Sequence, residues 1–133
     1  MNEVVKFLEE NPIQYLATVG LDGKPKVRPI MFYFESEGKL YFCTSNQKPV
    51  YKEIKNSPYI ELTTASPEFV WIRINGKVVF SDDIKIKKAI IEKSEIVKSI
   101  YQTVDNPTLE AFYIEGKATI ADFSGEPPKE YTL

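Results

Sequence analysis

The sequence predicts a mainly β (α+β) fold, an antiparallel β-barrel with helical additions. Three observations support this fold class. About six β-prone segments follow one another, most of them joined by short turns of the kind that make hairpins. Only two or three segments have helical periodicity, so strands and helices do not alternate as they do in a parallel α/β sheet. Asn75-Gly76 and Glu115-Gly116 occupy similar places in two of the strands, where a bend would suit a barrel.

In the first half of the chain, a short helix over residues 2–9 precedes three strands. Asn2 can cap this helix, its apolar residues form one face, and Pro12 marks its end. Pro29 falls inside the second strand. Because proline lacks a ladder donor, that strand should lie at a sheet edge, a bulge or a gap facing a ligand. The strands expected here are, in order, 13–19, 26–34 and 39–43, with turns at Asp22-Gly23 and at 35–38.

In the second half, a helix over 49–56 begins with Pro49, which suits a first helical turn. A long β-prone stretch over 69–80 contains Asn75-Gly76, which fits either a hairpin or one strand bent at the glycine. Ser81 or Asp82 can cap a later helix. The other elements expected here are a strand over 59–64, the capped helix over 83–101, a strand over 108–123 and an extended tail.

The composition is that of one globular domain spanning residues 1–133, with 43% hydrophobic and 27% charged residues. A net charge of −2 argues against broad attraction to nucleic acid or anionic membranes. No apolar run approaches the roughly 20 residues of a membrane span. The acidic, amphipathic N-terminus does not resemble a signal peptide, so a cytoplasmic protein is expected.

Two residue types restrict the chemistry. The chain has no histidine, which excludes Ser-His-Asp and Cys-His catalysis and histidine zinc sites, and the scattered carboxylates suggest no metal site. The single cysteine, Cys43, cannot form an internal disulfide. Without a base to activate it, Cys43 is better interpreted as a small buried apolar residue than as a nucleophile.

The spacing of polar residues predicts a phosphate site. If residues 35–38 form the hairpin loop, Phe34 faces Lys39 and Arg28 faces Ser45, or a neighbour after a slip of one residue. The guanidinium would then lie beside Thr44-Ser45-Asn46-Gln47-Lys48, which leads into a helix whose N-terminus attracts anions. Solvent-exposed charges beside an ordinary helix cap are the competing interpretation, and the residues alone slightly favour it.

Further residues extend this hypothetical site. Pro29, Ile30 and Met31 follow Arg28 and would run beneath whatever carries the phosphate, although an ordinary core position explains Ile30 better. Trp71 and Arg73 share one strand face, where they would stack on a ligand or lie in a subunit interface. A half-buried tryptophan with a cation–π neighbour is equally consistent with the pattern.

The order of several segments resembles the pyridoxamine 5'-phosphate oxidase-like FMN-binding split barrels over residues 3–123. The closest similarity is to the branch of general-stress flavoproteins and NimA/NimC nitroimidazole-resistance proteins. The segments that carry the resemblance are Leu16-Ala17-Thr18-Val19, Asp22-Gly23-Lys24-Pro25, Val27-Arg28-Pro29-Ile30, Leu40-Tyr41-Phe42-Cys43-Thr44-Ser45 and residues 48–58.

This resemblance implies a six-stranded split barrel that forms a homodimer, with FMN at the subunit interface. It also implies that Asn75-Gly76 bends one long strand. Trp71 would come from the second subunit, and Phe123 would help to cover the flavin. The residues implied to hold FMN are Arg28, Pro29, Ile30, Met31, Cys43, Thr44, Ser45, Gln47 and Lys48.

The resemblance further implies a flavin oxidoreductase that passes electrons from a reduced nicotinamide to a small acceptor such as a nitroaromatic or quinone. A flavin carrier or stress-related sensor without turnover is the alternative. The C-terminal residues 123–128 lack the arginine- and histidine-containing motif of the true oxidases, which argues against pyridoxamine phosphate oxidation. Some relatives bind deazaflavin F420 or haem; F420 or no cofactor is the alternative to FMN, whereas haem would lack a histidine ligand.

Overall fold

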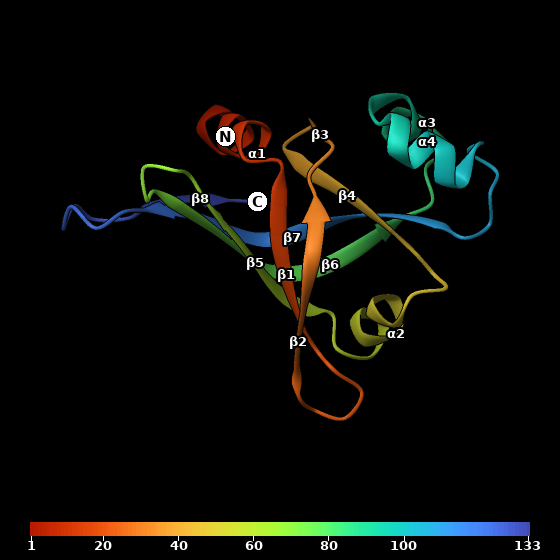
Figure 1. The fold of residues 1–133 in the computed structure, drawn as a ribbon, viewed down its shortest axis with the longest axis horizontal. Coiled ribbons are helices and arrows are strands. Elements are labelled where there is room, and N and C mark those ends of the chain that lie inside the picture. Colours follow the sequence, from red (N-terminus) through yellow and green to blue (C-terminus); the bar gives the residue numbers. More distant parts are fainter.

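The structure is a computed structural model that describes all residues, 1–133, and its dominant feature is one antiparallel sheet accompanied by four helices (Figure 1). This confirms the predicted fold class. The helices are α1 (Asn2–Glu10), α2 (Pro49–Asn56), α3 (Ile84–Lys93) and α4 (Glu95–Tyr101). The strands are β1 (Ile13–Val19), β2 (Pro25–Met31), β3 (Phe34–Ser36), β4 (Lys39–Ser45), β5 (Tyr59–Ala65), β6 (Trp71–Ser81), β7 (Leu109–Ala121) and β8 (Lys129–Thr132).

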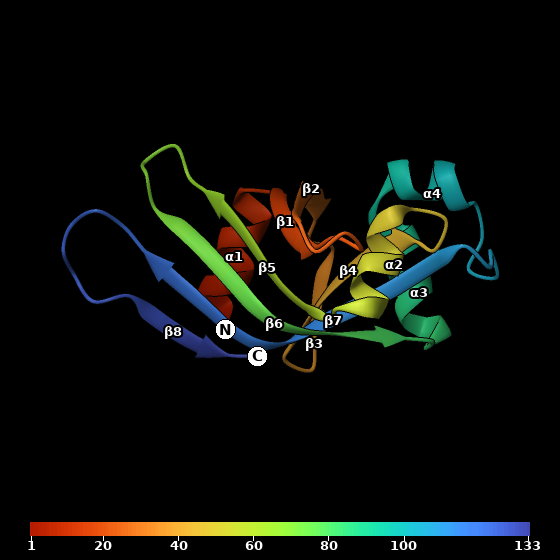
Figure 2. The same cartoon turned by 90° about the horizontal axis from the view of Figure 1, so that it is seen from below.

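The sheet is strongly curved but open. Its strand order is β2-β1-β5-β6-β7-β4-β3, with β8 added beside β7. The two end strands, β2 and β3, are consecutive in the chain and are joined only through Phe32 and Tyr33. β2 and β4 therefore belong to opposite ends of the sheet and diverge from a common corner, which leaves the barrel split between them (Figures 1 and 2).

The main core fills the inside of this curved sheet. Strand β1 alternates strictly, with Gln14, Leu16 and Thr18 buried and the intervening residues exposed, as expected for a strand with one face against a core. α1 adds Val4 and Leu8, one turn apart on one helix face. A smaller second cluster lies under α3 and α4 and includes Ile90, Ile91, Val97, Tyr101 and Leu109.

β6 and β7 pair along eleven positions and bend together at two glycines. Gly76 lies directly opposite Gly116, so the prediction of one long strand bent at Asn75-Gly76 is confirmed and the hairpin is excluded. A Cβ on Gly116 would lie 1.9 Å from the carbonyl oxygen of Asn75. The two backbones approach so closely at the bend that only glycine fits on either strand.

Three elements differ from the sequence-based expectation. The strand expected over 26–34 is divided into β2 and β3. The helix expected over 83–101 is divided at Ser94, whose backbone is extended and whose hydroxyl accepts a hydrogen bond from the Val97 amide, which starts α4. The tail forms β8 on β7, and the hydroxyl of Tyr131 donates a hydrogen bond to the carboxylate of Glu3 in α1. None of the helices has the length and apolar character needed to cross a membrane.

Candidate functional site

A cavity of about 210 Å³ lies in the split between β2 and β4, beside α2. Strand β2 contributes side chains from both of its faces, because it is an edge strand with no partner on this side. Of the sheet edge, bulge or ligand-facing gap predicted from Pro29, the structure shows an edge strand. The lining residues are Ile13, Leu16, Arg28, Pro29, Ile30, Met31, Tyr33, Cys43, Thr44, Lys48, Val50, Ile54 and Phe112.

The hairpin register used to predict this site is wrong. Ser36 pairs with Lys39, so the loop has two residues, and Phe34 faces Tyr41 where Lys39 was expected. Arg28 does not face Ser45 in a ladder; its strand partner is Leu16 on β1. Arg28 and the end of β4 nevertheless line the same cavity, because they approach each other across the split.

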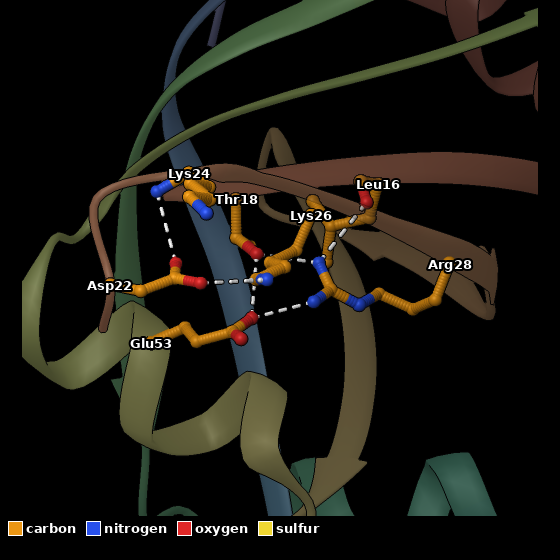
Figure 3. A network of polar contacts seen from close by, with 7 residues as sticks. All are labelled: Leu16, Thr18, Asp22, Lys24, Lys26, Arg28 and Glu53. Carbon is orange, nitrogen blue, oxygen red and sulfur yellow. Dashed lines mark hydrogen bonds and ion pairs between the residues drawn. The ribbon is translucent and has the colours of Figure 1, made fainter. Parts of the chain in front are cut away.

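Arg28 is held by residues of β1 and α2 (Figure 3). Its Nη1 donates hydrogen bonds to the carbonyl oxygen of Leu16 at 3.2 Å and to Thr18 Oγ1 at 2.6 Å. Its Nη2 donates to Glu53 Oε1 at 2.6 Å, and Thr18 Oγ1 donates to the same carboxylate oxygen at 2.8 Å. Thr18 and Glu53 thus accept hydrogen bonds from the two terminal nitrogens of the guanidinium.

This arrangement uses only part of the hydrogen-bonding capacity of Arg28. A guanidinium has five N–H donors, of which three bind within the chain. The Nε–H and the second Nη2–H, which form one side of the guanidinium, have no partner in the protein. Such a side binds two oxygens of a phosphate or carboxylate at once.

Lys48 brings a second positive charge to the cavity. It is the N-cap residue of α2, and its ammonium forms none of the ion pairs of the chain. Pro49, the first residue of α2, has no N–H, and the Tyr51 amide donates to the Lys48 carbonyl oxygen at 3.1 Å, which leaves the Val50 amide at this end of the helix. Lys48, the helix N-terminus and the free side of Arg28 therefore form a cationic region suited to an anion.

Away from these charges, the cavity is apolar and neutral. Ile30 and Met31 continue along β2 beyond Arg28, and Tyr33 and Cys43 contribute to the wall. Burial raises the pKa of the Cys43 thiol to about 11, and burial likewise raises the pKa of Tyr33 above the usual tyrosine value. Both groups therefore stay protonated at neutral pH, and this part of the cavity suits an uncharged, largely apolar group.

The structure gathers most of the predicted site residues but not all of them. Arg28, Pro29, Ile30, Met31, Cys43, Thr44 and Lys48 line the cavity. Ser45 and Gln47 belong to the adjacent turn, where Ser45 Oγ accepts a hydrogen bond from the Gln47 amide at 3.1 Å. Trp71 and Phe123 are not part of the cavity wall; their rings pack against each other with centroids 4.8 Å apart.

Sequence reasoning missed Glu53, Thr18 and Tyr33. Glu53 had a detectable signal, because it follows Val50 by three residues and adjoins Ile54, and therefore falls in the apolar stripe of α2. Thr18 occupies an inward position of the alternating β1 pattern. Tyr33 gave no signal, since its place depends on the break between β2 and β3.

The family model described as pyridoxamine 5'-phosphate oxidase matches residues 1–121 of the chain. No curated protein matches this chain. A NimC/NimA family protein from Clostridium acetobutylicum is 33% identical, with a TM-score of 0.89 over 100% of this chain and 92% of that one.

Two more distant structures share the fold. General stress protein 26 from Bacillus anthracis is 19% identical, with a TM-score of 0.76 over 98% of this chain and 97% of that one. A pyridoxamine 5'-phosphate oxidase-related, FMN-binding protein from Nostoc punctiforme is 17% identical, with a TM-score of 0.65 over 96% of this chain and 84% of that one.

Proposed function

Because the chain belongs to the pyridoxamine 5'-phosphate oxidase family, we propose that it binds flavin mononucleotide in the cavity between β2 and β4. The observation that carries this proposal is that Arg28, whose guanidinium keeps two donors without a partner in the protein, lines an otherwise mostly apolar cavity together with Lys48. FMN has the matching chemistry, an anionic phosphate at one end and a flat ring at the other. A related structure named as FMN-binding supports the choice of ligand.

The residues present fit the two ends of FMN. Arg28 would bind the phosphate through two parallel hydrogen bonds, while Lys48 and the α2 N-terminus would add positive charge. Thr44 would add a hydroxyl donor beside them. Pro29, Ile30 and Met31 would lie along the ring; their position beyond Arg28 on the same strand and in the cavity wall supports this.

The proposed activity is electron transfer from a reduced nicotinamide to a small acceptor such as a nitroaromatic or quinone. Bound FMN would supply the redox chemistry. The chain would bind and orient it, and the apolar wall would exclude water from the ring. The chain has no histidine to donate a hydrogen bond beside the ring. Tyr33 lines the cavity and is kept protonated by burial, so its hydroxyl would serve as a donor there.

We extend the proposal to a homodimer. The outer faces of β1 and β2 expose an apolar patch, defined by Ile13, Tyr15, Val19 and Val27, and exposed apolar patches mark interaction surfaces. Ile13 also lines the cavity, so a second copy on this patch would cover the cavity mouth. The cavity volume is below the ~300–1,000 Å³ usual for ligand sites, which is consistent with a site completed by a second copy.

Flavin binding is tested by adding FMN to the purified protein and recording the visible spectrum and the flavin fluorescence. We expect saturable binding and, on anaerobic addition of NADH or NADPH, bleaching of the flavin absorbance. A protein that binds no FMN would contradict the proposal. Binding without bleaching by either nicotinamide would indicate a flavin carrier in place of an oxidoreductase.

Replacing Arg28 tests the position of the phosphate. Arg28→Ala removes the charge-assisted hydrogen bonds to the phosphate, which is worth about 1.5–3 kcal/mol, so the Kd for FMN should rise at least about tenfold. Riboflavin has no phosphate and serves as the control ligand, with a Kd expected to change little. An unchanged FMN affinity would refute the role of Arg28.

A further inference from the structure

Glu53 is a buried carboxylate at a position where α2 would be expected to carry an apolar residue. It is 6% exposed and lies in the helix stripe that also buries Val50 and Ile54. A carboxylate removed from water destabilises a fold unless it is paired and hydrogen-bonded. Glu53 meets this condition only through Arg28 and Thr18, which bind the same oxygen, Oε1.

These contacts restrict how Arg28 can present its free donors. The guanidinium is bound at three points, the carbonyl oxygen of Leu16 and the side chains of Thr18 and Glu53, and these come from two different elements. It cannot rotate without breaking a short hydrogen bond to a buried partner. A group held in its binding orientation loses less conformational freedom when a ligand arrives.

Glu53 also balances the charge of Arg28. Their ion pair is 2.6 Å long, and the carboxylate side chain is only 8% exposed. Lys48 has no such partner and supplies unbalanced positive charge at the cavity. The two cations therefore differ in character: Lys48 acts as a charge, whereas Arg28 acts mainly through directed hydrogen bonds.

We propose that Glu53, together with Thr18, is a positioning residue that aims the free side of Arg28 at the phosphate of the bound flavin. This inference rests on the proposed FMN site and deepens it. The alternative is that Glu53 only fastens α2 to the sheet. The two roles differ in one measurable respect, because positioning affects the recognition of the phosphate and fastening affects all ligands equally.

The experiment measures the Kd for FMN and for riboflavin by fluorescence quenching, and takes the riboflavin-to-FMN ratio as the contribution of the phosphate. Glu53→Ala should lower this ratio about tenfold, the low end of the loss of a charge-assisted hydrogen bond. Glu53→Gln retains an acceptor for Nη2 and should keep most of the ratio. In the Arg28→Ala background, Glu53→Ala should lower the ratio no further, because it acts through Arg28.

Thr18→Val offers a second route if Glu53→Ala does not fold. It should lower the ratio about tenfold, because the lost hydroxyl accepts a hydrogen bond from the charged Arg28 and donates one to the charged Glu53. Glu92→Ala, at an exposed carboxylate on α3, is the matched control and should leave the ratio unchanged. Equal losses of affinity for FMN and riboflavin, or additive effects of the Arg28 and Glu53 substitutions on the ratio, would overturn the positioning role. The proposed FMN site would stand in either case. If the unaltered protein binds neither flavin, the proposed function fails and this inference fails with it.

Discussion

Arg28 shows how one side chain is divided between the fold and a ligand. Its three intramolecular hydrogen bonds join β2 to β1 and α2, and its two remaining donors lie on one side of the guanidinium. Lysine has no planar fork and could not bind these three buried acceptors while keeping a bidentate side free. The identity of residue 28 therefore matters to both stability and recognition.

Cys43 is predicted to be a slow nucleophile. Burial raises its thiol pKa to about 11, above the ordinary value of 9.0, so at pH 8 it carries about a hundredfold less thiolate than an exposed cysteine. Iodoacetamide should modify it slowly at pH 8 and faster as the pH approaches 11, and saturating FMN should slow the reaction further. Mass spectrometry measures the rate.

The control for Cys43 is the same protein unfolded in urea, in which the thiol regains its ordinary pKa and reacts quickly. Equal rates for the folded and the unfolded protein at pH 8 would contradict the effect of burial. Since the chain has one cysteine, every modification is assigned to Cys43 without ambiguity.

Among the elements, β6 and β7 depend most on one local feature, the crossing of Gly76 and Gly116. Gly116→Ala would bring a methyl group to 1.9 Å from the Asn75 carbonyl oxygen and 2.7 Å from Gly76 Cα. Both contacts are with backbone and cannot be relieved by moving a side chain. The free energy of unfolding should fall by about 1–3 kcal/mol or more, measured by urea denaturation.

Gly23→Asn is the matched control for the glycine crossing. Gly23 lies in the turn after β1 with φ of 77°, and nothing lies within 4 Å of a Cβ built there. Asparagine tolerates this conformation better than other non-glycine residues, so little loss of stability is expected. A Gly116→Ala protein as stable as this control would show that the two strands can separate at the bend without cost.

At the scale of the whole molecule, the proposed dimer depends on the apolar patch of β1 and β2. Val27 is the most exposed residue of this patch, at 69%, and Val27→Lys would place a charge inside the proposed interface. We expect analytical ultracentrifugation to show that the mass falls from two chains to one, together with weaker FMN binding. Ile100→Lys, at a residue 61% exposed on α4, should keep both properties.

Two outcomes would contradict the dimer. The unaltered protein could sediment as a single chain at micromolar concentration, or the Val27→Lys and Ile100→Lys proteins could dissociate equally. Trp71 adds a further readout, because it lies outside the cavity of its own chain and would reach a flavin only across the interface. Quenching of its fluorescence by FMN should therefore disappear with the dimer.

The elements of this protein follow from local patterns in its sequence. The β-prone residues 13–19 predict β1, Pro49 marks the start of α2, and Pro29 indicates an edge, a bulge or a ligand-facing gap for β2, all without knowledge of the rest of the chain. The absence of histidine likewise excludes several kinds of catalysis, and this conclusion requires only the sequence. Such features depend on residues a few positions apart.

Only the tertiary structure decided how the cavity is formed. The predicted register placed Arg28 in a ladder with the end of β4, but a two-residue loop and a break after Met31 lead β2 to the opposite edge of the sheet. The partners of Arg28 also could not be predicted, because Glu53 lies 25 positions away and becomes its neighbour only when α2 packs on β1. Contacts over such distances depend on how the sheet curves, which no local pattern encodes.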